Sequence, residues 1–380
     1  MKKMLMLASV ASMIDQFNMN NIDILHQLGV EVHVAANFVE GNSTSKTKVD
    51  TFKAKLMELK IPIFQIDFTR NIFLAHQHIQ AYRQLYKIAK REKYDFIHCH
   101  SPIGGVIGRL VGRQLNIPVI YTAHGFHFYK NSSKLSWAIY YPIERFLSRY
   151  THTLVTINRE DYERANGFSA ENCAYIPGIG IDLNKFKKKP VKNQAIREEF
   201  LNSPDEDFLI LSVGELNKNK NHQVVIKALS LINNPKIHYV LCGQGDLKDE
   251  LEAQAIDAGL QDNVKFLGFR QDIQDIYSAA DLFVFPSYRE GLPVSLMEAM
   301  ASGLPVVCSN IRGNVDLIVD HQGGFLVDPS DEVSLKDAIL KLYNDSELRK
   351  QQTNYNDNLI RNFSIDTVAL KMEEIYKGLV

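Results

Sequence analysis

The sequence of 380 residues has no long hydrophobic run. Its longest apolar stretches, such as MLMLAS near the start and LFVFP later, are far shorter than the roughly 20 residues that a membrane-spanning helix needs. It also shows no pattern typical of a signal peptide. The sequence therefore predicts a protein that stays in the cytoplasm and does not span a membrane.

Cysteine is scarce and scattered. Cys99, Cys173, Cys242 and Cys308 lie in or directly after apolar runs, and no two of them have the spacing of metal ligands or of a redox pair. No Asp-x-Asp stands at the end of a predicted strand. These absences predict buried thiols and no metal site.

The charge of the chain is uneven although its formal net charge is only −1. Residues 1–190 carry 25 Lys and Arg against 15 Asp and Glu, whereas residues 191–380 carry 18 against 29. The basic first half favours an anionic partner such as a lipid phosphate or a membrane surface, and a solvated surface without a partner is the alternative. No nucleic-acid partner is expected.

Short apolar runs rich in β-branched residues alternate with helical patterns along the whole chain. Because these runs are nearly continuous rather than alternating, both faces of each sheet should be covered by helices, as in parallel doubly wound sheets. The sequence therefore predicts an α/β protein with two Rossmann-like domains. The predicted strands are KKMLMLAS, VEVHVAA, IPIFQID, DFIHCH, PVIYTAH, HTLVTIN and CAYIP in the first half, and FLILSVG, IHYVLCG, VKFLG, DLFVFPS, PVVCS and GGFLV in the second.

A chain of this length fits two domains of about 150 to 200 residues each. The first domain is expected over residues 1–185, and a linker region over 186–205 contains most of the basic stretch LNKFKKKPVKNQ. The second domain is expected over 206–363. Residues 364–380 read as an amphipathic helix that is a candidate to cross back to the first domain. Because parallel sheets bind ligands at the carboxyl ends of their strands, the predicted site is a cleft between the two domains.

The stretch REGLPVSLMEAMASGLPVV places Glu290 just before a predicted helix and Glu298 about one turn inside it. Pro293 suits the first turn of that helix and Gly303 its end. Free amides at the helix start, together with the helix dipole, would form an anion site suited to a diphosphate. The residues that would supply these amides are Gly291, Leu292 and Val294.

Two carboxylates on either side of a diphosphate can each accept hydrogen bonds from hydroxyl groups. Glu298 would then hold the vicinal diol of a ribose, and Glu290 the hydroxyls of a transferred sugar. The alternative is structural: Glu298 would be a solvated helix residue, and Glu290 would balance the helix dipole.

Three further loops of the second half follow predicted strands. Lys218 and Lys220 lie between a strand and a helix, where an ammonium group can neutralise a departing diphosphate, or can simply be solvated. Gly243 and Gly245 form a Gly-x-Gly turn that permits close backbone approach, which alone is a weak signal. The loop of Gly268, Phe269 and Arg270 is a candidate to contact a base through its backbone.

These residues resemble the retaining GT-B glycosyltransferases of family 4, also called glycosyl transferases group 1. EGLPVSLMEAMASGLPVV is similar to the family's E-x7-E signature, AADLFVFPS to the segment before it, and YIPGIGIDLNKF to the strand before the interdomain linker. VGELNKNKNH and TAHGFHFY are similar to members that make capsules and exopolysaccharides. The resemblance covers nearly the whole chain and is most specific over residues 210–328.

The resemblance implies a nucleotide-diphosphate sugar as donor, with a UDP-sugar as the first candidate, and no cofactor or metal. It implies Glu298 on the ribose, Glu290 on the transferred sugar and Lys220 on the phosphates. The reaction would be a retaining, front-face transfer of a hexosyl or acetamidohexosyl group. The implied acceptor is a polyprenyl-diphosphate-linked or growing saccharide, reached by a protein bound peripherally at the inner face of a bacterial membrane.

The sequence departs from the family pattern at two places. Many members carry an Arg after the glycine of the first strand in the second domain, and this chain has Glu215 there. No glycine occurs between Ser9 and Leu25, where the family has a Gly-rich loop. Ser9 and Asp15 are the acceptor-side candidates of this loop, along with Ser12 and Asn18.

Histidines gather at two predicted strand ends of the first domain. DFIHCH ends with His98 and His100, and PVIYTAHGFHFY contains His124 and His127. A histidine at a strand end can donate to a sugar hydroxyl, and a structural histidine is the alternative. His124 matches the family's His-Gly position and is the catalytic candidate, whereas His100 is an acceptor-side candidate.

Two rival functions and one ambiguous helix remain open at this level. A nucleotide-sugar 2-epimerase also uses two Rossmann-like domains, and a silent partner would bind nucleotide sugar without catalysis. The presence of Glu290 and Lys220 favours the transferase. The aromatic segment KNSSKLSWAIYYPIERFLSRY is helical in pattern, and it either lies on a membrane surface or packs on the first domain.

Overall fold

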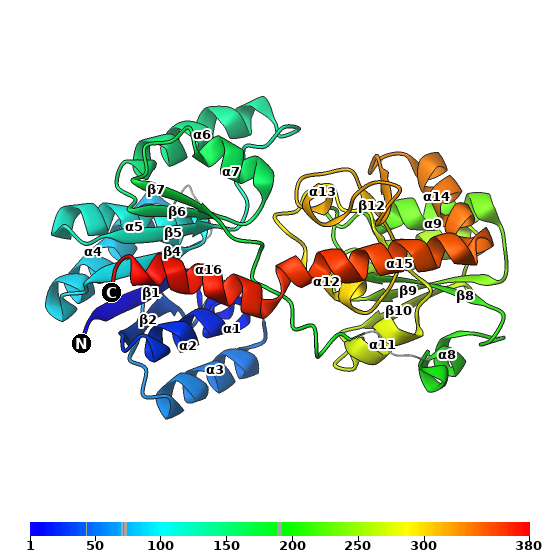
Figure 1. Cartoon of the computed structure of the whole chain (residues 1–380), viewed down its shortest axis with the longest axis horizontal. Helices are drawn as coiled ribbons and strands as arrows, with labels where there is room; N and C mark the ends of the chain where they lie inside the picture. Colours follow the sequence, from blue (N-terminus) through cyan, green and yellow to red (C-terminus); the bar gives the residue numbers. More distant parts are fainter. Residues whose placement is uncertain (43, 70, 72–73, 188–191) are drawn as a thin grey trace. The chain divides into compact units, whose positions relative to one another are not determined.

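The computed structural model describes residues 1–42, 44–69, 71, 74–187 and 192–380. The chain forms two compact units, one of Met1–Gly180 with Asp366–Val380 and one of Ile181–Ile365 (Figure 1). The predicted linker region includes residues 188–191, which lie outside the described residues. Each predicted strand forms a strand of one of two parallel sheets, so the expected pair of Rossmann-like domains is confirmed.

The first unit is built on a parallel sheet in the order β3-β2-β1-β4-β5-β6-β7. Its strands are β1 (Lys3–Val10), β2 (Glu31–Asn37), β3 (Ile63–Gln65), β4 (Phe96–His100), β5 (Val119–Ala123), β6 (Thr153–Thr156) and β7 (Asn172–Tyr175).

Helices cover both faces of this sheet. On one face, Cys99 of β4 shares a buried core with Ile107 of α5. On the other face the Phe96 ring lies 6.3 Å from the Tyr376 ring of α16, the last helix of the chain. The helices are α1 (Ala11–Phe17), α2 (Met19–Gln27), α3 (Lys46–Glu58), α4 (Ala75–Glu92), α5 (Pro102–Leu115), α6 (Lys134–Ser148), α7 (Arg159–Ala165) and α16 (Ile365–Lys377).

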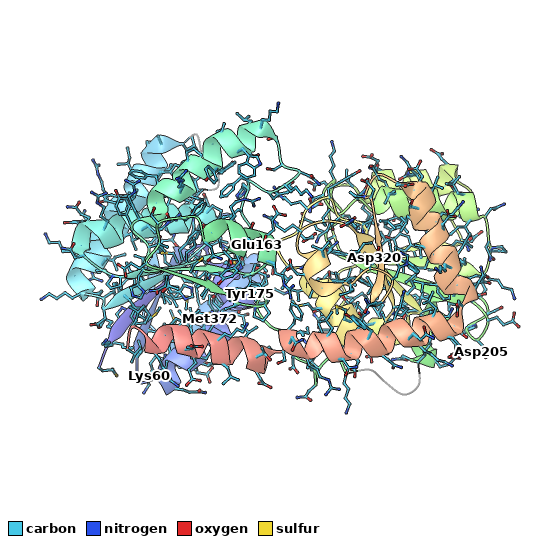
Figure 2. All side chains as sticks on the ribbon, turned by 45° about the horizontal axis from the view of Figure 1, so that its top comes forward. Lys60, Glu163, Tyr175, Asp205, Asp320 and Met372 are labelled. Atoms are coloured by element: carbon cyan, nitrogen blue, oxygen red, sulfur yellow. The ribbon has the colours of Figure 1, made fainter. Side chains whose placement is uncertain are left out.

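The amphipathic pattern predicted for α16 is confirmed by its packing. Val368, Met372 and Tyr376 are buried at four-residue spacing, which is one face of a helix. Figure 2 labels Met372 on this helix and Tyr175 on β7, and the Lys371 ammonium of α16 lies 5.3 Å from the Tyr175 ring. The end of the chain therefore completes the first unit.

The second unit has a parallel sheet in the order β10-β9-β8-β11-β12-β13. Its strands are β8 (Phe208–Val213), β9 (Ile237–Cys242), β10 (Val264–Gly268), β11 (Leu282–Phe285), β12 (Val306–Ser309) and β13 (Gly324–Val327). Its helices are α8 (Gln194–Phe200), α9 (His222–Ile232), α10 (Lys248–Asp257), α11 (Ile273–Ala279), α12 (Val294–Ala301), α13 (Asn314–Leu317), α14 (Glu332–Asn344) and α15 (Ser346–Ile360), followed by the 3-10 turn η1 (Arg361–Phe363).

The helix α8 lies within the stretch that the sequence presents as a linker. It is only seven residues long, and its Asn193 cap accepts a hydrogen bond from the Ile196 amide. Its buried residues are Arg197 and Phe200. Because Arg197 is charged, the sequence of this helix shows no apolar periodicity. Arg197 donates to the carbonyls of Asp207 and Ala279, so polar contacts hold α8 in place.

The strand order of each sheet reverses once. The reversal lies between β1 and β4 in the first unit and between β8 and β11 in the second. Ligands of open parallel sheets bind outside the carboxyl ends of the strands at such a point. The loops after these four strands are therefore the places to look for function.

The prediction of buried thiols holds for three of the four cysteines. Cys99, Cys242 and Cys308 are buried, but Cys173 is only half-buried because β7 is an edge strand. Within the described residues, no helix is long and apolar enough to cross a membrane.

Candidate functional site

The strand-order reversal of the second unit brings a lysine and a glutamate together. Lys220 lies in the loop after β8, and Glu290 lies in the loop after β11. Lys220 Nζ is 2.7 Å from Glu290 Oε1 and 4.6 Å from the centre of the Phe285 ring. Two of the predicted site residues, 70 positions apart in sequence, thus form one half-buried ion pair at the carboxyl edge of the sheet.

Asparagines join the two loops that carry this ion pair. The Tyr288 amide donates to the Asn219 carbonyl at 2.8 Å, and Asn219 Nδ2 donates to the Arg289 carbonyl at 3.0 Å. Asn221 Nδ2 donates to the Pro286 carbonyl at 3.1 Å. Asn219 and Asn221 were not among the predicted site residues, although the Asn-rich run NKNKN before a helix is a signal for side-chain hydrogen bonds to backbone.

Glycines allow the backbones at this edge to approach closely. A Cβ on Gly243 would stand 1.8 Å from the Gly214 carbonyl oxygen, and the φ of Gly243 is +157°. A Cβ on Gly245 would stand 2.3 Å from the Leu216 carbonyl oxygen. The close approach at the Gly-x-Gly turn is therefore one between two loops of the protein itself, and the role of Gly243 in donor binding stays a prediction.

The helix α12 begins where the sequence places it. Pro293 is the N-cap residue and makes no side-chain capping hydrogen bond, and Gly303, with φ +77°, follows the last turn. The first amides of a helix have no acceptor within the helix, so an uncapped start can donate to a ligand or to water. Gly291 and Val294 are half-buried and Leu292 is buried.

Glu298 is held by a tyrosine that the sequence analysis did not single out. The hydroxyl group of Tyr277 on α11 donates to Glu298 Oε2 at 3.0 Å and to the Ser295 carbonyl at 3.0 Å. Burial raises the pKa of Glu298 to about 7, while the hydrogen bond with Tyr277 and the charge of Lys185 oppose this rise. Glu298 is thus a partly desolvated carboxyl on α12 rather than a solvated helix residue.

Other predicted donor residues differ in their surroundings. Lys218 is exposed, whereas Lys220 is ion-paired. Gly268 has φ +64° at the end of β10, and Phe269 after it is exposed. The Arg270 guanidinium forms ion pairs with Asp272 at 2.7 Å and Glu199 at 2.8 Å. Ion pairs of Arg270 with Asp272 and with Glu199 of α8 hold this loop, and its backbone remains a candidate for contact with a base.

Arg312 is a further cation that the sequence analysis missed. It is buried, and its Nε donates to the Glu290 carbonyl at 3.1 Å. A Cβ on the adjacent Gly313 would stand 2.4 Å from the Gly291 carbonyl oxygen. The loop after β12 therefore packs against the segment before α12, and the signal for it was the sequence Arg-Gly in the loop that follows a predicted strand.

In the first unit, two serines meet at the strand-order reversal. Ser9 at the end of β1 donates through its amide to Ser101 Oγ at 3.0 Å, and the two hydroxyls are also hydrogen-bonded to each other. Ser101 has φ +69°, and a Cβ on Gly104 would stand 3.0 Å from its Oγ. The candidate Ser9 thus lies at the edge that the topology selects.

Three of the candidate histidines form a row beside these serines. His100 Nδ1 lies 3.1 Å from His124 Nε2, and the rings of His98 and His100 are 4.1 Å apart. His98 extends the row, because its Nδ1 lies 2.8 Å from the Tyr376 hydroxyl of α16 and its Nε2 lies 2.8 Å from Thr122 Oγ1. The structure therefore brings the candidates His100 and His124 together.

The histidine row is uncharged at neutral pH. Burial lowers the pKa of His98 to about 3 and the pKa of His124 to about 4. Burial and the neighbouring rings also hold the pKa of His100 well below its usual value. Within the described residues, His100 Nε2 has no hydrogen-bond partner, so a buried ring nitrogen is left for a ligand or for water.

The remaining candidates of the first unit lie apart from this row or have other partners. His127 stacks on Tyr140 of α6 at 4.6 Å. Asp15 on α1 is half-buried, and burial raises its pKa while Lys55 and Lys48 lower it. Ser12 donates through its amide to Asn42, and Asn18 donates to the Met13 carbonyl. Across the described residues, no group of three or more His, Cys, Asp or Glu has the arrangement of a metal site.

Two family models match the chain, one for each half. Residues 20–185 match the model described as Glycosyltransferase Family 4, and residues 193–359 match Glycosyl transferases group 1. The second match includes Lys220, Glu290 and Glu298.

Two relatives match most of the chain. EpsD of Bacillus subtilis is 34% identical over 385 residues, which covers 99% of this chain and 97% of the relative. A UDP-Gal:α-D-GlcNAc-diphosphoundecaprenol α-1,3-galactosyltransferase of Escherichia coli is 32% identical over 321 residues, with 82% of each chain covered.

A solved structure matches the fold over the full length. Anabaena HepE, crystallised with UDP and glucose, has a TM-score of 0.79 and 21% identity, with all of both chains covered. This identity carries the fold alone, which is that of the GT-B glycosyltransferases. The two family matches and the full-length relative show that this chain belongs to the glycosyltransferases of family 4, the glycosyl transferases group 1.

Proposed function

We propose that the protein transfers a hexosyl or acetamidohexosyl group from a UDP-sugar to a lipid-linked saccharide, with retention of the anomeric configuration. The product would be an intermediate of a capsule or exopolysaccharide, and the protein would work as a peripheral protein at the inner face of a bacterial membrane. The observation that carries the proposal is the ion pair of Lys220 and Glu290 at the strand-order reversal, with Glu298 on the adjoining helix.

The donor would bind to the second unit. The Lys220 ammonium and the uncapped start of α12 supply positive charge for a diphosphate. Glu298 would accept hydrogen bonds from the ribose hydroxyls and Glu290 from the hydroxyls of the transferred sugar. The transfer would need no metal, because Lys220 and the helix dipole would stabilise the charge that develops on the leaving diphosphate.

The acceptor side would be supplied by the first unit. His124 would donate to, or accept from, a hydroxyl of the reacting sugar as a neutral imidazole, and His100 would fix its ring through the bond at 3.1 Å. Ser9 and Asp15 would contact the acceptor. The name of the Escherichia coli relative supports a lipid-linked acceptor, because the acceptor in that name is a sugar on diphosphoundecaprenol.

In a front-face reaction the leaving diphosphate departs as the acceptor hydroxyl attacks from the same side. The bond from the anomeric carbon to the diphosphate oxygen breaks, and the bond to the acceptor oxygen forms on the same face. The acceptor proton passes to the departing phosphate oxygen. No protein nucleophile is required, so catalysis would rest on the positioning of donor and acceptor and on charge stabilisation.

A calorimetric titration with UDP, GDP and ADP tests the donor part of this proposal. We expect UDP to bind the wild type and to bind the Glu298→Ala variant more weakly, because the ribose loses its acceptor. If none of the three nucleotides binds, even with a saccharide acceptor present, the proposed donor is wrong. Loss of transfer when an intact enzyme is treated with a chelator would contradict the metal-free part.

A further inference from the structure

The helix α6 of the first unit packs against its domain through only one face. Its inward side chains are aromatic: the Trp137 and Tyr141 rings lie 5.6 Å and 5.4 Å from the Phe128 ring, and Tyr140 stacks on His127. The inward face of α6 therefore packs on the first domain, which is one of the two alternatives that the sequence offers for this segment. Leu147 is buried as well.

The opposite face of α6 is apolar and open to solvent. Leu135, Ile139, Ile143 and Phe146 are 67%, 38%, 42% and 48% exposed. Their spacing of four, four and three residues places them along one side of the helix. The outward face of a helix in a soluble protein is normally polar. We call these four side chains the α6 stripe.

The exposed charged residues of this helix and of its C-cap are all cations. Lys134, Arg145 and Arg149 are exposed, and the Arg149 guanidinium lies 4.7 Å from the Phe146 ring. The single carboxylate of α6, on Glu144, is buried and pairs with Arg109 at 2.8 Å. At the end of α5 the exposed Arg113 lies 4.1 Å from the Tyr150 ring.

An apolar stripe bordered by basic residues matches the surface of an anionic membrane. Apolar side chains enter the boundary between headgroups and acyl chains, while arginine and lysine heads meet lipid phosphates. A second copy of the same face would instead bring like charges together. We propose that the α6 stripe docks the protein on an anionic lipid surface, with the α6 axis in the membrane plane. This proposal rests on the proposed function, whose acceptor is linked to a lipid.

Co-sedimentation of the full chain with vesicles tests this docking. The vesicles are phosphatidylcholine alone, or phosphatidylcholine with about a third phosphatidylglycerol, close to an anionic bacterial surface. The test variant is Leu135→Gln/Ile139→Gln. The matched control is Leu370→Gln, because Leu370 is 68% exposed on α16 of the same unit. Circular dichroism and the melting temperature establish that each variant folds.

We expect the wild type and Leu370→Gln to bind the anionic vesicles, and the stripe variant to lose at least about tenfold in partition coefficient. Arg145→Gln/Arg149→Gln should lose binding chiefly at low salt, because salt screens its charge contribution. Equal binding of the stripe variant and the wild type would overturn the proposal, as would a wild type that binds neither vesicle. A wild-type dimer that the stripe variant cannot form would assign the face to a second copy instead.

Transfer to a water-soluble acceptor saccharide separates this proposal from the proposed function. If the stripe variant transfers as fast as the wild type but no longer binds vesicles, both proposals stand. If the wild type binds vesicles through the stripe but transfers no sugar from any nucleotide, the proposed function fails and the docking holds. If transfer occurs while the stripe variant binds vesicles normally, only the docking fails.

Discussion

The two units place different chemistry at the same topological position. In the second unit, the loops after β8 and β11 hold the charged pair of Lys220 and Glu290. In the first unit, the ends of β1 and β4 hold two hydrogen-bonded serines, and the ends of β4 and β5 hold the histidine row, which is uncharged at neutral pH. A shared sheet order therefore fixes where a site lies and leaves its chemistry to the side chains.

Depth explains the difference in charge. The histidines lie on or directly after strands and are desolvated, so burial lowers their pKa values and keeps them neutral. Lys220 and Glu290 lie several residues beyond their strands in half-exposed loops, where an ion pair remains partly solvated. A charged edge suits an anionic diphosphate, and a neutral edge suits the hydroxyl groups of a saccharide.

The largest effect should come from the charged edge. Replacement of Lys220 by Ala removes the cation proposed to face the departing diphosphate and leaves Glu290 unpaired. We expect the rate of sugar transfer to fall by about 10²- to 10³-fold. Steady-state kinetics with a UDP-sugar measure this. The matched control is Lys218→Ala, because Lys218 is exposed and has no part in the ion pair with Glu290. Equal losses of transfer rate in both variants would show that the ion pair makes no particular contribution to transfer.

The neutral edge should affect turnover rather than nucleotide affinity. We expect His124→Ala to lower kcat by about 10- to 100-fold, as the loss of one hydrogen-bonding group near a reacting centre does. The His124→Gln variant keeps a hydrogen-bonding group and should lose less. A normal kcat in the His124→Ala variant would show that His124 has only a structural role.

The pH dependence of nucleotide binding should reflect Glu298. Its pKa is raised to about 7 in the free protein, and ribose hydroxyls donate to the ionised form, so binding strengthens as the pH rises through 7. Between pH 6 and 8 the ionised fraction of Glu298 grows by about tenfold, which bounds the gain in UDP affinity from this group. Titrations of the wild type and Glu298→Gln across this range measure it. A pH dependence that survives in Glu298→Gln would have another source.

The smallest of these effects should come from the far end of the histidine row, and it concerns the stability of the protein rather than transfer. Tyr376→Phe removes the hydroxyl that lies 2.8 Å from His98 Nδ1 in a buried position. We expect a loss of about 1–2 kcal/mol in the free energy of unfolding of the protein, because a buried polar atom loses its partner. Urea unfolding followed by circular dichroism measures this loss. Unchanged stability would show that His98 finds another partner.

Much of the fold could be predicted because continuous apolar runs are a strong local signal. Runs such as DFIHCH and DLFVFPS became β4 and β11, and their ends gave His100 and the segment before Glu290. The helix α12 and its end at Gly303 followed from local turn chemistry. Local patterns therefore located both carboxyl edges.

Pairings across the chain could not be predicted in the same way. Nothing near Lys220 in the sequence indicates that Glu290, 70 residues later, lies 2.7 Å away. Tyr277 reaches Glu298 from the preceding helix, and Tyr376 reaches His98 from the end of the chain. These contacts depend on how helices and loops pack on the sheets, which periodicity does not specify.

The most direct test of the division between a charged and a neutral edge is a side-by-side titration with UDP. We expect Lys220→Ala to bind UDP at least about tenfold more weakly than the wild type, as the loss of a charge-assisted contact implies. We expect His124→Ala to bind UDP within about twofold of the wild type. A His124→Ala variant that loses as much UDP affinity as Lys220→Ala would contradict this division.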